Sequence, residues 1–195
     1  MRRAALNIIV LLAAASGAAA YSSGPPPGRT GDAGLTCNAS GCHESFGLGS
    51  GDVTLSLLDA SSRVPATTWT VAQDASLVFR VTSGEPGRMR WGFELTALHD
   101  GFMAGSFDPG PNQLVQQDAQ GHDDLSHGFG GTGLGQTTGF EWPFTWHPPA
   151  TDVGTVTFFA CANAANGNDT PLGDYIECTT FQLFSSTDRD HDGIH

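Results

Sequence analysis

The chain has 195 residues, of which 39% are hydrophobic and 9% aromatic, which is enough apolar material for one folded domain. Its 20 acidic residues outnumber the 8 basic ones and give a net charge of −12, so its surface repels phosphate backbones. Nucleic acid is therefore excluded as an expected partner. An acidic surface suits solubility, calcium binding or a basic redox partner.

The first 20 residues have the three regions of a secretory signal peptide. Arg2 and Arg3 precede an apolar run over residues 4–15, and alanines at residues 18–20 suit cleavage. The run is short for a bilayer crossing. We expect cleavage near Ala20, a mature chain without a membrane span, and a secreted or periplasmic location at the cell envelope. Disulfides and covalently attached haem both form in that compartment.

Residues 21–51 are rich in glycine, proline and serine and have too few apolar side chains for a core of their own. We expect this segment to lie against the following domain or to be free in solution. Over residues 52–185, apolar and polar residues alternate in short runs between Gly, Pro, Asp and Asn turns. Strands are expected at residues 53–57, 77–81, 91–97, 113–117, 140–146, 155–162 and 175–184. This pattern predicts an all-β fold, an antiparallel β-sandwich of the immunoglobulin-like kind.

A glycine-rich stretch without alternation, residues 121–139, interrupts these strands and is expected to be a long loop. Loops of this length in a compact domain are usually functional or mobile. It holds His122, Asp123, Asp124 and His127, whose side chains suit zinc or copper but fall short of a full site. A solvated polar loop is the alternative interpretation.

The most specific chemical signal is the run Cys37-Asn-Ala-Ser-Gly-Cys42-His43. Two thiols followed directly by an imidazole can hold a haem covalently, with the cysteines on the vinyl groups and the histidine on the iron. Four residues separate these cysteines, whereas two are usual. The motif leaves two interpretations open: a c-type haem held by Cys37, Cys42 and His43, or a small Cys37–Cys42 disulfide loop beside a histidine.

Residues 21–31 and the segment that leads into Cys42 and His43 resemble the start of a family of exported bacterial proteins. This family carries a reelin-like β-sandwich, a choice-of-anchor domain of the reelin type. Residues 90–98, 146–154 and 154–167 carry the same resemblance. It spans nearly all of the mature chain and implies a reelin-like sandwich behind a haem-type Cys-x-x-Cys-His segment, but it implies little about activity.

If haem binds, a second axial ligand or an open position decides what the iron does. We expect His127 as this ligand because its surroundings resemble a family segment with a histidine before glycine-rich residues. His122 and Met103 are secondary candidates. Two histidine ligands favour electron transfer, whereas an open position favours ligand binding or peroxide chemistry. Arg29 and Arg90 are candidates to neutralise the propionates, with surface ion pairs as the alternative.

Two further cysteines, Cys161 and Cys178, occur where the family pattern has none. Both lie on expected strands that are joined by a turn near residues 166–174, and adjacent antiparallel strands bring Cα atoms within disulfide range. We predict a Cys161–Cys178 disulfide that contributes roughly 3 kcal/mol in the chain-entropy model. Cys37 and Cys42 then remain for each other or for a haem.

Calcium is suggested by the alternating carboxylates of Asp188, Asp190 and Asp192, which precede Gly193. They form the first half of a calcium loop and resemble the start of a thrombospondin type 3 repeat. No closing bidentate acid follows before His195, so we expect weak binding in an acidic tail over residues 186–195.

Motifs of nucleophilic or metal-dependent hydrolysis do not occur: there is no Gly-x-Ser-x-Gly, no His-Glu-x-x-His and no phosphate-binding loop before a helix. The tryptophans are expected in the core, with a carbohydrate groove as the alternative; they are Trp69, Trp91, Trp142 and Trp146.

We therefore predict an exported haem c protein for electron transfer or haem-based sensing, with a redox protein as partner, rather than an enzyme. The competing prediction is a binding or adhesion module for a surface ligand, stabilised by two disulfides and by calcium.

Overall fold

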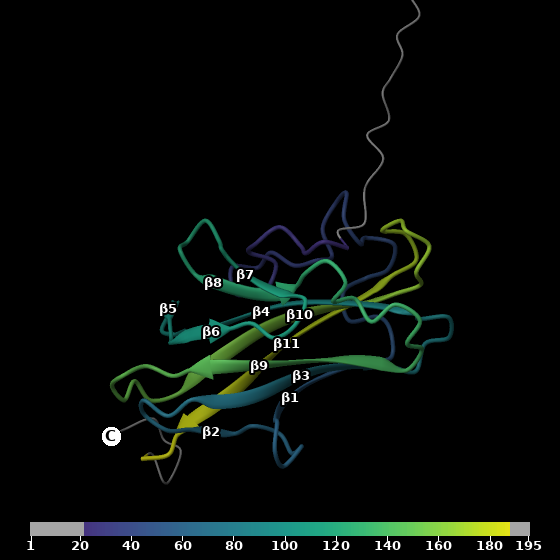
Figure 1. Cartoon of the computed structure of the whole chain (residues 1–195). Helices are drawn as coiled ribbons and strands as arrows, with labels where there is room; N and C mark the ends of the chain where they lie inside the picture. The colour runs from purple at the N-terminus through teal and green to yellow at the C-terminus, as the bar shows by residue number, and fades with distance from the viewer. Residues whose placement is uncertain (1–21, 188–195) are drawn as a thin grey trace, which may run out of the picture.

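The computed structural model describes residues 22–187, and they form an all-β fold (Figure 1). Its strands are β1 (Val53–Asp59), β2 (Thr68–Trp69), β3 (Ala75–Ser83), β4 (Arg90–His99), β5 (Phe102–Met103), β6 (Ser106–Asp108), β7 (Gln113–Gln117), β8 (Asp123–His127), β9 (Gly139–His147), β10 (Val156–Ala165) and β11 (Tyr175–Ser185). This range contains no helix with the length and hydrophobicity that a membrane crossing requires. The expected signal peptide lies outside the described residues.

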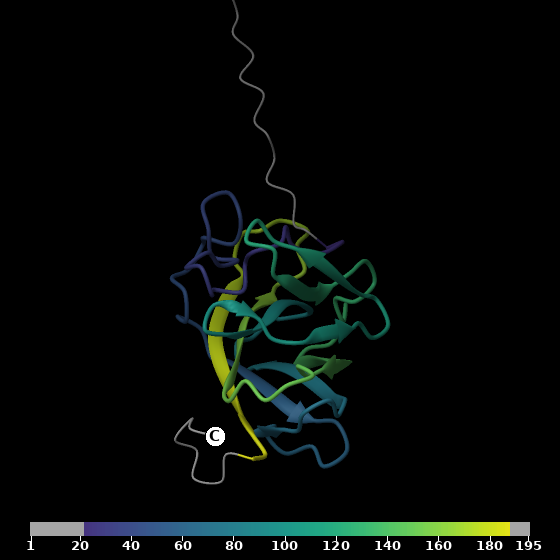
Figure 2. The same cartoon turned by 90° about the vertical axis from the view of Figure 1, so that its left-hand side faces the viewer.

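The strands form two sheets that pack face to face. The smaller sheet has the order β1-β3-β9-β6, and the larger has the order β2-β11-β10-β4-β8-β7, with β5 paired to the end of β4. Neighbouring strands run antiparallel except for the short β2, which is parallel to β11. Figure 2 shows the two layers after a quarter turn. The predicted antiparallel β-sandwich is confirmed.

Aromatic side chains from both sheets meet in the core. Phe93 of β4 lies 4.5 Å from the ring of Trp142 on β9 and 5.2 Å from the ring of Phe79 on β3, measured between centroids. All four tryptophans are buried, and each indole N–H donates to a backbone carbonyl, which removes the cost of burying that polar group. They are core residues, as expected, and form no carbohydrate groove.

β4 is buried on both of its faces, which the alternation in its sequence did not indicate. Trp91, Phe93 and Leu95 point into the sandwich, but Glu94 and Thr96 on the opposite face are also 0% exposed. The residues before β1 cover that outer face, because the Gly28 N–H donates to the carboxylate of Glu94. Figures 1 and 2 show this N-terminal segment in purple and blue at the top of the molecule. It therefore lies against the domain, which was one of the two expectations.

The expectation of a continuous loop over residues 121–139 is wrong in part, because Asp123–His127 form strand β8 between β4 and β7. Leu125 pairs with Leu95 on the core face, while Ser126 pairs with Glu94 on the outer face. The outer-face residues are polar yet buried beneath the N-terminal segment. A strand with a polar buried face lacks the alternation that identifies strands in a sequence.

The predicted disulfide is present between Cys161 on β10 and Cys178 on β11. These two residues stand directly opposite each other in the antiparallel register, with Cα atoms 4.1 Å apart. Cys161 is fully buried, and its sulfur lies near Gly31 of the N-terminal segment, where an added Cβ would be 3.6 Å from it. The disulfide thus fixes the two strands on which the segment lies.

Replacing Cys161 and Cys178 together by alanine is expected to lower the free energy of unfolding by roughly 3 kcal/mol, because the bridge restricts the unfolded chain. Urea denaturation followed by tryptophan fluorescence measures this change. Wild-type protein kept in reductant is the matched control and should lose a similar amount. A double variant that is as stable as the oxidised wild type would contradict the prediction.

Candidate functional site

The side chains predicted to hold a haem converge at one end of the sandwich, although they are far apart in sequence. Cys37, Cys42 and His43 of the N-terminal segment and His127 at the end of β8 line one cavity of about 60 Å³. The rest of its wall comes from Pro25, Pro26, Arg29, Gly92, Phe93 and Asn163. The fold thus brings together the covalent motif and the histidine chosen as the second ligand.

The segment from Cys37 to His43 forms a compact loop, although four residues separate its two cysteines. The N–H of His43 donates to the carbonyl oxygen of Cys37 at 3.2 Å, and the N–H of Cys42 donates to that of Ala39 at 2.8 Å. Gly41 has a φ of 80°, a conformation that glycine adopts without strain. Both thiols are free, so within the described chain the alternative Cys37–Cys42 disulfide is not formed.

A buried carboxylate orients the imidazole of His43. Its Nδ1 lies 2.8 Å from Oδ2 of Asp174, which is 1% exposed and accepts the N–H of Asn166 through its other oxygen. A carboxylate accepts the Nδ1 proton and leaves the lone pair on Nε2, which is the arrangement found behind histidine ligands of metals. The sequence showed Asp174 as no more than a turn residue.

The imidazole of His127 is buried rather than solvated, because it packs on the bare backbone of Gly92. Its Nδ1 lies 3.0 Å from the N–H nitrogen of Phe93. A Cβ at residue 92 would approach Cε1 of the ring to 2.8 Å, closer than side chains tolerate. A glycine in the middle of β4 therefore makes the room for this histidine, and a solvated loop histidine is the wrong interpretation.

His43 and His127 also line a second, adjoining cavity of about 40 Å³. Arg29 borders the first cavity and Arg90 borders the second. In each arginine the Nε is buried without a hydrogen-bond partner in the part of the chain that the structure describes. Unpaired guanidinium N–H groups suit an anionic group.

The donor set fits a c-type haem, but the cavities between the closed walls are too small for one. Two thiols, an imidazole oriented by a carboxylate and a second imidazole match what such a haem requires. The Nε–H groups of Arg29 and Arg90 add two donors without partners, although Arg90 also forms an ion pair with Asp169 at 2.6 Å, the expected alternative for this residue. Cavities of about 60 and 40 Å³ are well below the ~300–1,000 Å³ of small-molecule pockets. Haem binding therefore requires that the N-terminal segment move away from β4 around Pro25 and Pro26.

The closed segment also suppresses the reactivity of Cys37. Burial, reinforced by the Glu94 carboxyl and the Cys42 thiol against the opposing charge of Arg29, raises the pKa of Cys37 to about 12. The thiolate is the reactive form of cysteine, so this thiol is a poor nucleophile while the segment is docked.

The other predicted ligands do not reach this cavity. Met103 lies on β5, where its sulfur is 3.8 Å from the hydroxyl of Thr96. His122 contacts Asp32 and Asp118 instead. The expected metal cluster of His122, Asp123, Asp124 and His127 is wrong, because residues five apart along an extended chain are separated by roughly 15 Å. The calcium candidates Asp188, Asp190 and Asp192 lie outside the described residues.

Glu94 and Asp124 form a buried acid pair beneath the N-terminal segment that the sequence did not predict. Oε1 of Glu94 and Oδ2 of Asp124 both accept the N–H of Gly28, at 2.9 and 2.6 Å. Burial raises the pKa of Glu94 to about 9, and its hydrogen bond to Asp124 and the charge of that group add to this. Burial also raises the pKa of Asp124 to about 6. The pair therefore holds one proton at neutral pH. The available signal was a glutamate inside an otherwise apolar strand.

Comparisons with known proteins show similarity at the level of the sandwich. A scan against protein-family models and a search of curated proteins by sequence found no match. The human F-spondin reeler domain is similar in structure with a TM-score of 0.41 and 13% identity over 70% of this chain and 92% of that chain. A Reelin-N domain of F-spondin gives 0.43 and 16% over 71% and 89%. The sixth cohesin of Acetivibrio cellulolyticus scaffoldin B gives 0.44 and 10% over 68% and 98%.

The Glu94 pair predicts a pH dependence of stability. Its folded pKa lies above the ordinary value of 4.5, so the folded chain binds more protons than the unfolded chain between about pH 4.5 and pH 9. The free energy of unfolding contributed by this group is highest below pH 4.5 and falls as the pH rises through that window.

Glu94→Gln keeps the acceptor for Gly28 and cannot ionise, so it should be at least ~1 kcal/mol more stable than wild type at pH 8. Urea denaturation at pH 5 and pH 8 measures the difference.

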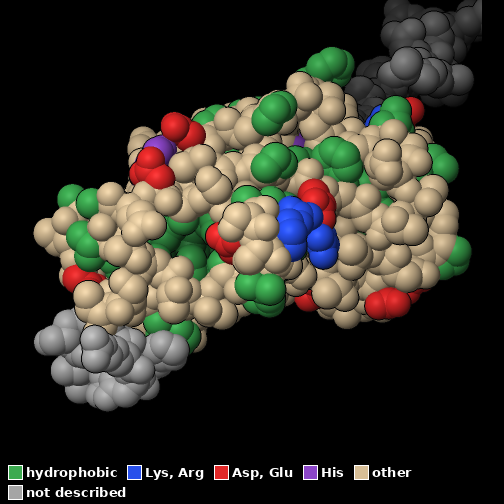
Figure 3. All heavy atoms as spheres, turned by 60° about the horizontal axis from the view of Figure 1, so that its bottom comes forward, with side chains coloured by type: hydrophobic (Ala, Val, Ile, Leu, Met, Phe, Trp, Pro, Cys, Tyr) green, Lys and Arg blue, Asp and Glu red, His purple; other side chains and the backbone are tan. Residues whose placement is uncertain are grey.

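Glu141 supplies a control of opposite sign on the smaller sheet. Figure 3 shows arginine and acidic side chains side by side on that face of the molecule. Burial is the largest single influence and raises the pKa of Glu141, but the hydrogen bonds and charges of Arg63 and Arg80 together outweigh it and lower this pKa. Its contribution is present above pH 4.5 and is lost as the pH falls, so Glu141→Gln should be less stable than wild type at pH 8. Equal pH profiles for wild type and Glu94→Gln would contradict the assignment of the acid pair.

Proposed function

We propose that this chain is an exported electron-transfer protein in which Cys37 and Cys42 bind one haem covalently and His43 and His127 are its axial ligands. The observation that carries this proposal is the convergence of these four side chains, from two distant parts of the sequence, on one cavity. A structural thiol pair does not require two imidazoles beside it, one of them buried and the other only 13% exposed.

The protein's own groups would hold the two axial nitrogens in place. Asp174 accepts the Nδ1 proton of His43, which directs the Nε2 lone pair to the metal and makes it a stronger donor. Gly92 receives the ring of His127 at the end of strand β8, so this ligand is positioned by the sheet rather than by a loop. Nδ2 of Asn163 lies 3.2 Å from both ring nitrogens of His43, so this amide would have to turn away from Nε2 for that nitrogen to bind the metal.

Two histidine ligands leave no open coordination position, which favours electron transfer over substrate chemistry. When bound, the haem supplies a one-electron redox couple. Arg29 and Arg90 offer their unpaired Nε groups to the propionates. The net charge of −12 suits a basic redox partner, whose approach an acidic surface accelerates.

A non-redox binding module at the cell surface is the second candidate. The small volume of the two cavities favours it, because the docked segment leaves no room for a porphyrin. In that case the N-terminal segment would serve to cover β4, and Cys37 would stay a partly buried thiol whose raised pKa keeps it protonated.

Expression of the full chain with a cytochrome c maturation system distinguishes the two candidates. The proposal predicts a red protein with a Soret band and an intact mass increased by one haem, which survives denaturation because thioether bonds do not dissociate. A Cys37→Ser, Cys42→Ser variant is the control and should be colourless. A colourless wild-type chain of polypeptide mass would exclude the redox function.

The axial assignment has a separate test in the haem-loaded protein. His127→Ala should convert a six-coordinate low-spin spectrum to a five-coordinate one, because the second nitrogen is removed. Gly92→Ala should shift the spectrum in the same direction, since its methyl group displaces the ring of His127. His99→Ala, a change to a partly exposed histidine that contacts the Thr155 carbonyl, is the matched control and should leave the spectrum unchanged. A low-spin spectrum retained in His127→Ala would exclude this residue as a ligand.

A further inference from the structure

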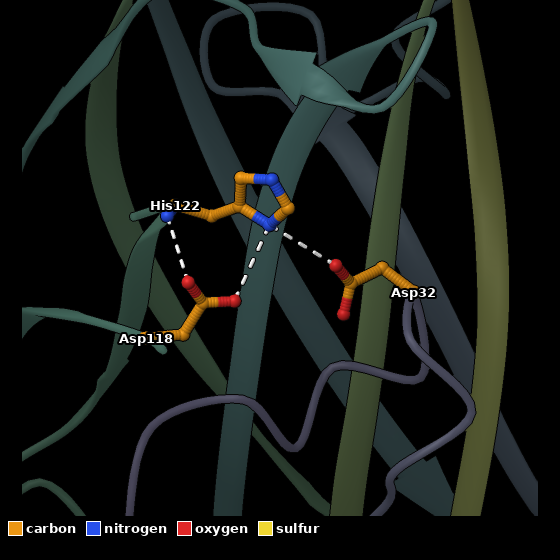
Figure 4. A group of neighbouring side chains, drawn as sticks. All are labelled: Asp32, Asp118 and His122. Carbon is orange, nitrogen blue, oxygen red and sulfur yellow. Dashed lines mark hydrogen bonds and ion pairs between the residues drawn. The ribbon is translucent and has the colours of Figure 1, made fainter. Parts of the chain in front are cut away.

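A second polar cluster lies where the N-terminal segment meets the turn between β7 and β8. Asp32 comes from the segment, and Asp118 and His122 come from the turn. One carboxylate oxygen from each aspartate and one ring nitrogen of His122 lie within 4.8 Å of one another. Figure 4 shows both carboxylates directed at the same nitrogen. None of these three residues lines the cavity of the haem ligands.

The hydrogen bond of His122 to Gly101 decides which ring nitrogen carries the proton and which faces the two carboxylates with its lone pair. Its Nε2 lies 3.2 Å from the carbonyl oxygen of Gly101, and a carbonyl can only accept, so Nε2 carries a proton. In the neutral ring, Nδ1 then presents its lone pair to Oδ2 of Asp32 at 3.2 Å and to Oδ2 of Asp118 at 3.3 Å. Three acceptors face one another, and such an arrangement needs a cation between them.

Asp118 gives an independent indication of a ligand. Its Oδ1 accepts the N–H groups of Gln120 and His122, both at 2.8 Å, which fixes the carboxylate. Its side chain is 1% exposed, yet among residues 22–187 no hydrogen-bond donor serves the second oxygen, which points to the cluster centre. Asp32 is fixed in the same way, because its Oδ1 accepts the hydroxyl of Thr30 at 2.7 Å. In each carboxylate, one oxygen is therefore fixed by hydrogen bonds and the other faces Nδ1 of His122.

A proton on Nδ1 of His122 only partly satisfies this cluster. A single N–H can donate to one carboxylate, and its charge offsets one of the two negative charges. A divalent ion offsets both and contacts all three atoms. Nitrogen and oxygen ligands at ~2.0–2.1 Å from a tetrahedral zinc ion are about 3.3 Å apart. Here Nδ1 of His122 lies 3.2 and 3.3 Å from the two carboxylate oxygens, and all three atoms lie within 4.8 Å of one another.

We propose that Asp32, Asp118 and His122 bind a divalent metal ion of the zinc type, with water in the fourth position. One imidazole and two carboxylates suit zinc, whereas calcium takes six to eight oxygens. Gly101 accepts the other ring proton of His122, as carbonyls commonly do behind histidine ligands. The site is independent of the proposed haem and goes beyond the proposed redox function.

The ion would clamp the N-terminal segment to the larger sheet. Asp32 belongs to the same segment as Cys37, Cys42 and His43, while Asp118 and His122 belong to the hairpin that carries His127. Residues 22–51 have few apolar side chains of their own, so polar contacts hold most of this segment in place. A metal bridge adds a contact that depends on ion concentration.

Isothermal titration of the full chain with zinc chloride tests the site. A Cys37→Ser, Cys42→Ser background removes the thiols as competing ligands. This chain should bind one zinc ion, and Asp118→Asn in the same background should weaken binding on the order of 100-fold or more. The asparagine retains Oδ1 and its two N–H contacts, so the turn is preserved.

His147→Gln is the matched control. His147 also contacts two aspartates, Asp74 at 2.7 Å and Asp108 at 3.0 Å, but through its two different ring nitrogens, so the three groups share no centre. This variant should bind zinc like the background chain. The site is excluded if the background chain shows no binding at about 100 µM zinc, or if Asp118→Asn binds as tightly as the background.

Trypsin digestion tests the clamp, because the chain has no lysine and Arg29 is the sole arginine within residues 22–51. The next residue, Thr30, is 1% exposed, so cleavage after Arg29 requires the segment to open. Zinc should slow this cleavage about tenfold or more and leave cleavage after Arg63, in an exposed loop, unchanged. If zinc binds but the rate at Arg29 does not change, the clamp is excluded.

Discussion

The burial of the outer face of β4 beneath residues 22–51 is the constraint on which the rest of the structure depends. A sheet of an antiparallel sandwich commonly leaves one face to solvent, but here Glu94 and Thr96 on that face are fully buried. Polar groups on a buried face need partners. The Gly28 N–H supplies one to both Glu94 and Asp124. A segment too polar to form a core is thereby held against the sheet.

The same burial determines the protonation of the groups below the segment. It raises the pKa of Glu94, of Asp124 and of Cys37, because each would be charged in a poorly solvated place. At neutral pH, Glu94 and Cys37 therefore keep their protons. The protons on these two groups lower the electrostatic cost of docking the segment on a chain with an overall charge of −12.

Local patterns in the sequence predict the sandwich, the buried tryptophans and the Cys161–Cys178 pair, because strand alternation and turn residues act over a few positions. The Cys37 to His43 motif is visible because its members are adjacent. The roles of Asp174 and Gly92 could not be predicted from the sequence, because they depend on which distant strands pack against the motif. Asp32 and Asp118 are brought together by the path of the segment over the β7–β8 turn. Proximity in sequence was misleading for His122 and His127, which an extended strand separates.

The closed state of the segment implies an order of events for the proposed redox site. Cys37 is partly covered when the segment is docked and its pKa is raised to about 12, so the thiols would form thioethers more readily while the segment is away from β4. A glycine- and proline-rich segment held by polar contacts opens at a lower free energy than the sandwich itself unfolds. Reaction of the thiols would therefore precede docking, and the haem-bearing segment would dock with its part around Pro25 and Pro26 farther from β4, because the closed position leaves no room for a porphyrin. On this argument the N-terminal segment is the last part of the chain to reach its final position.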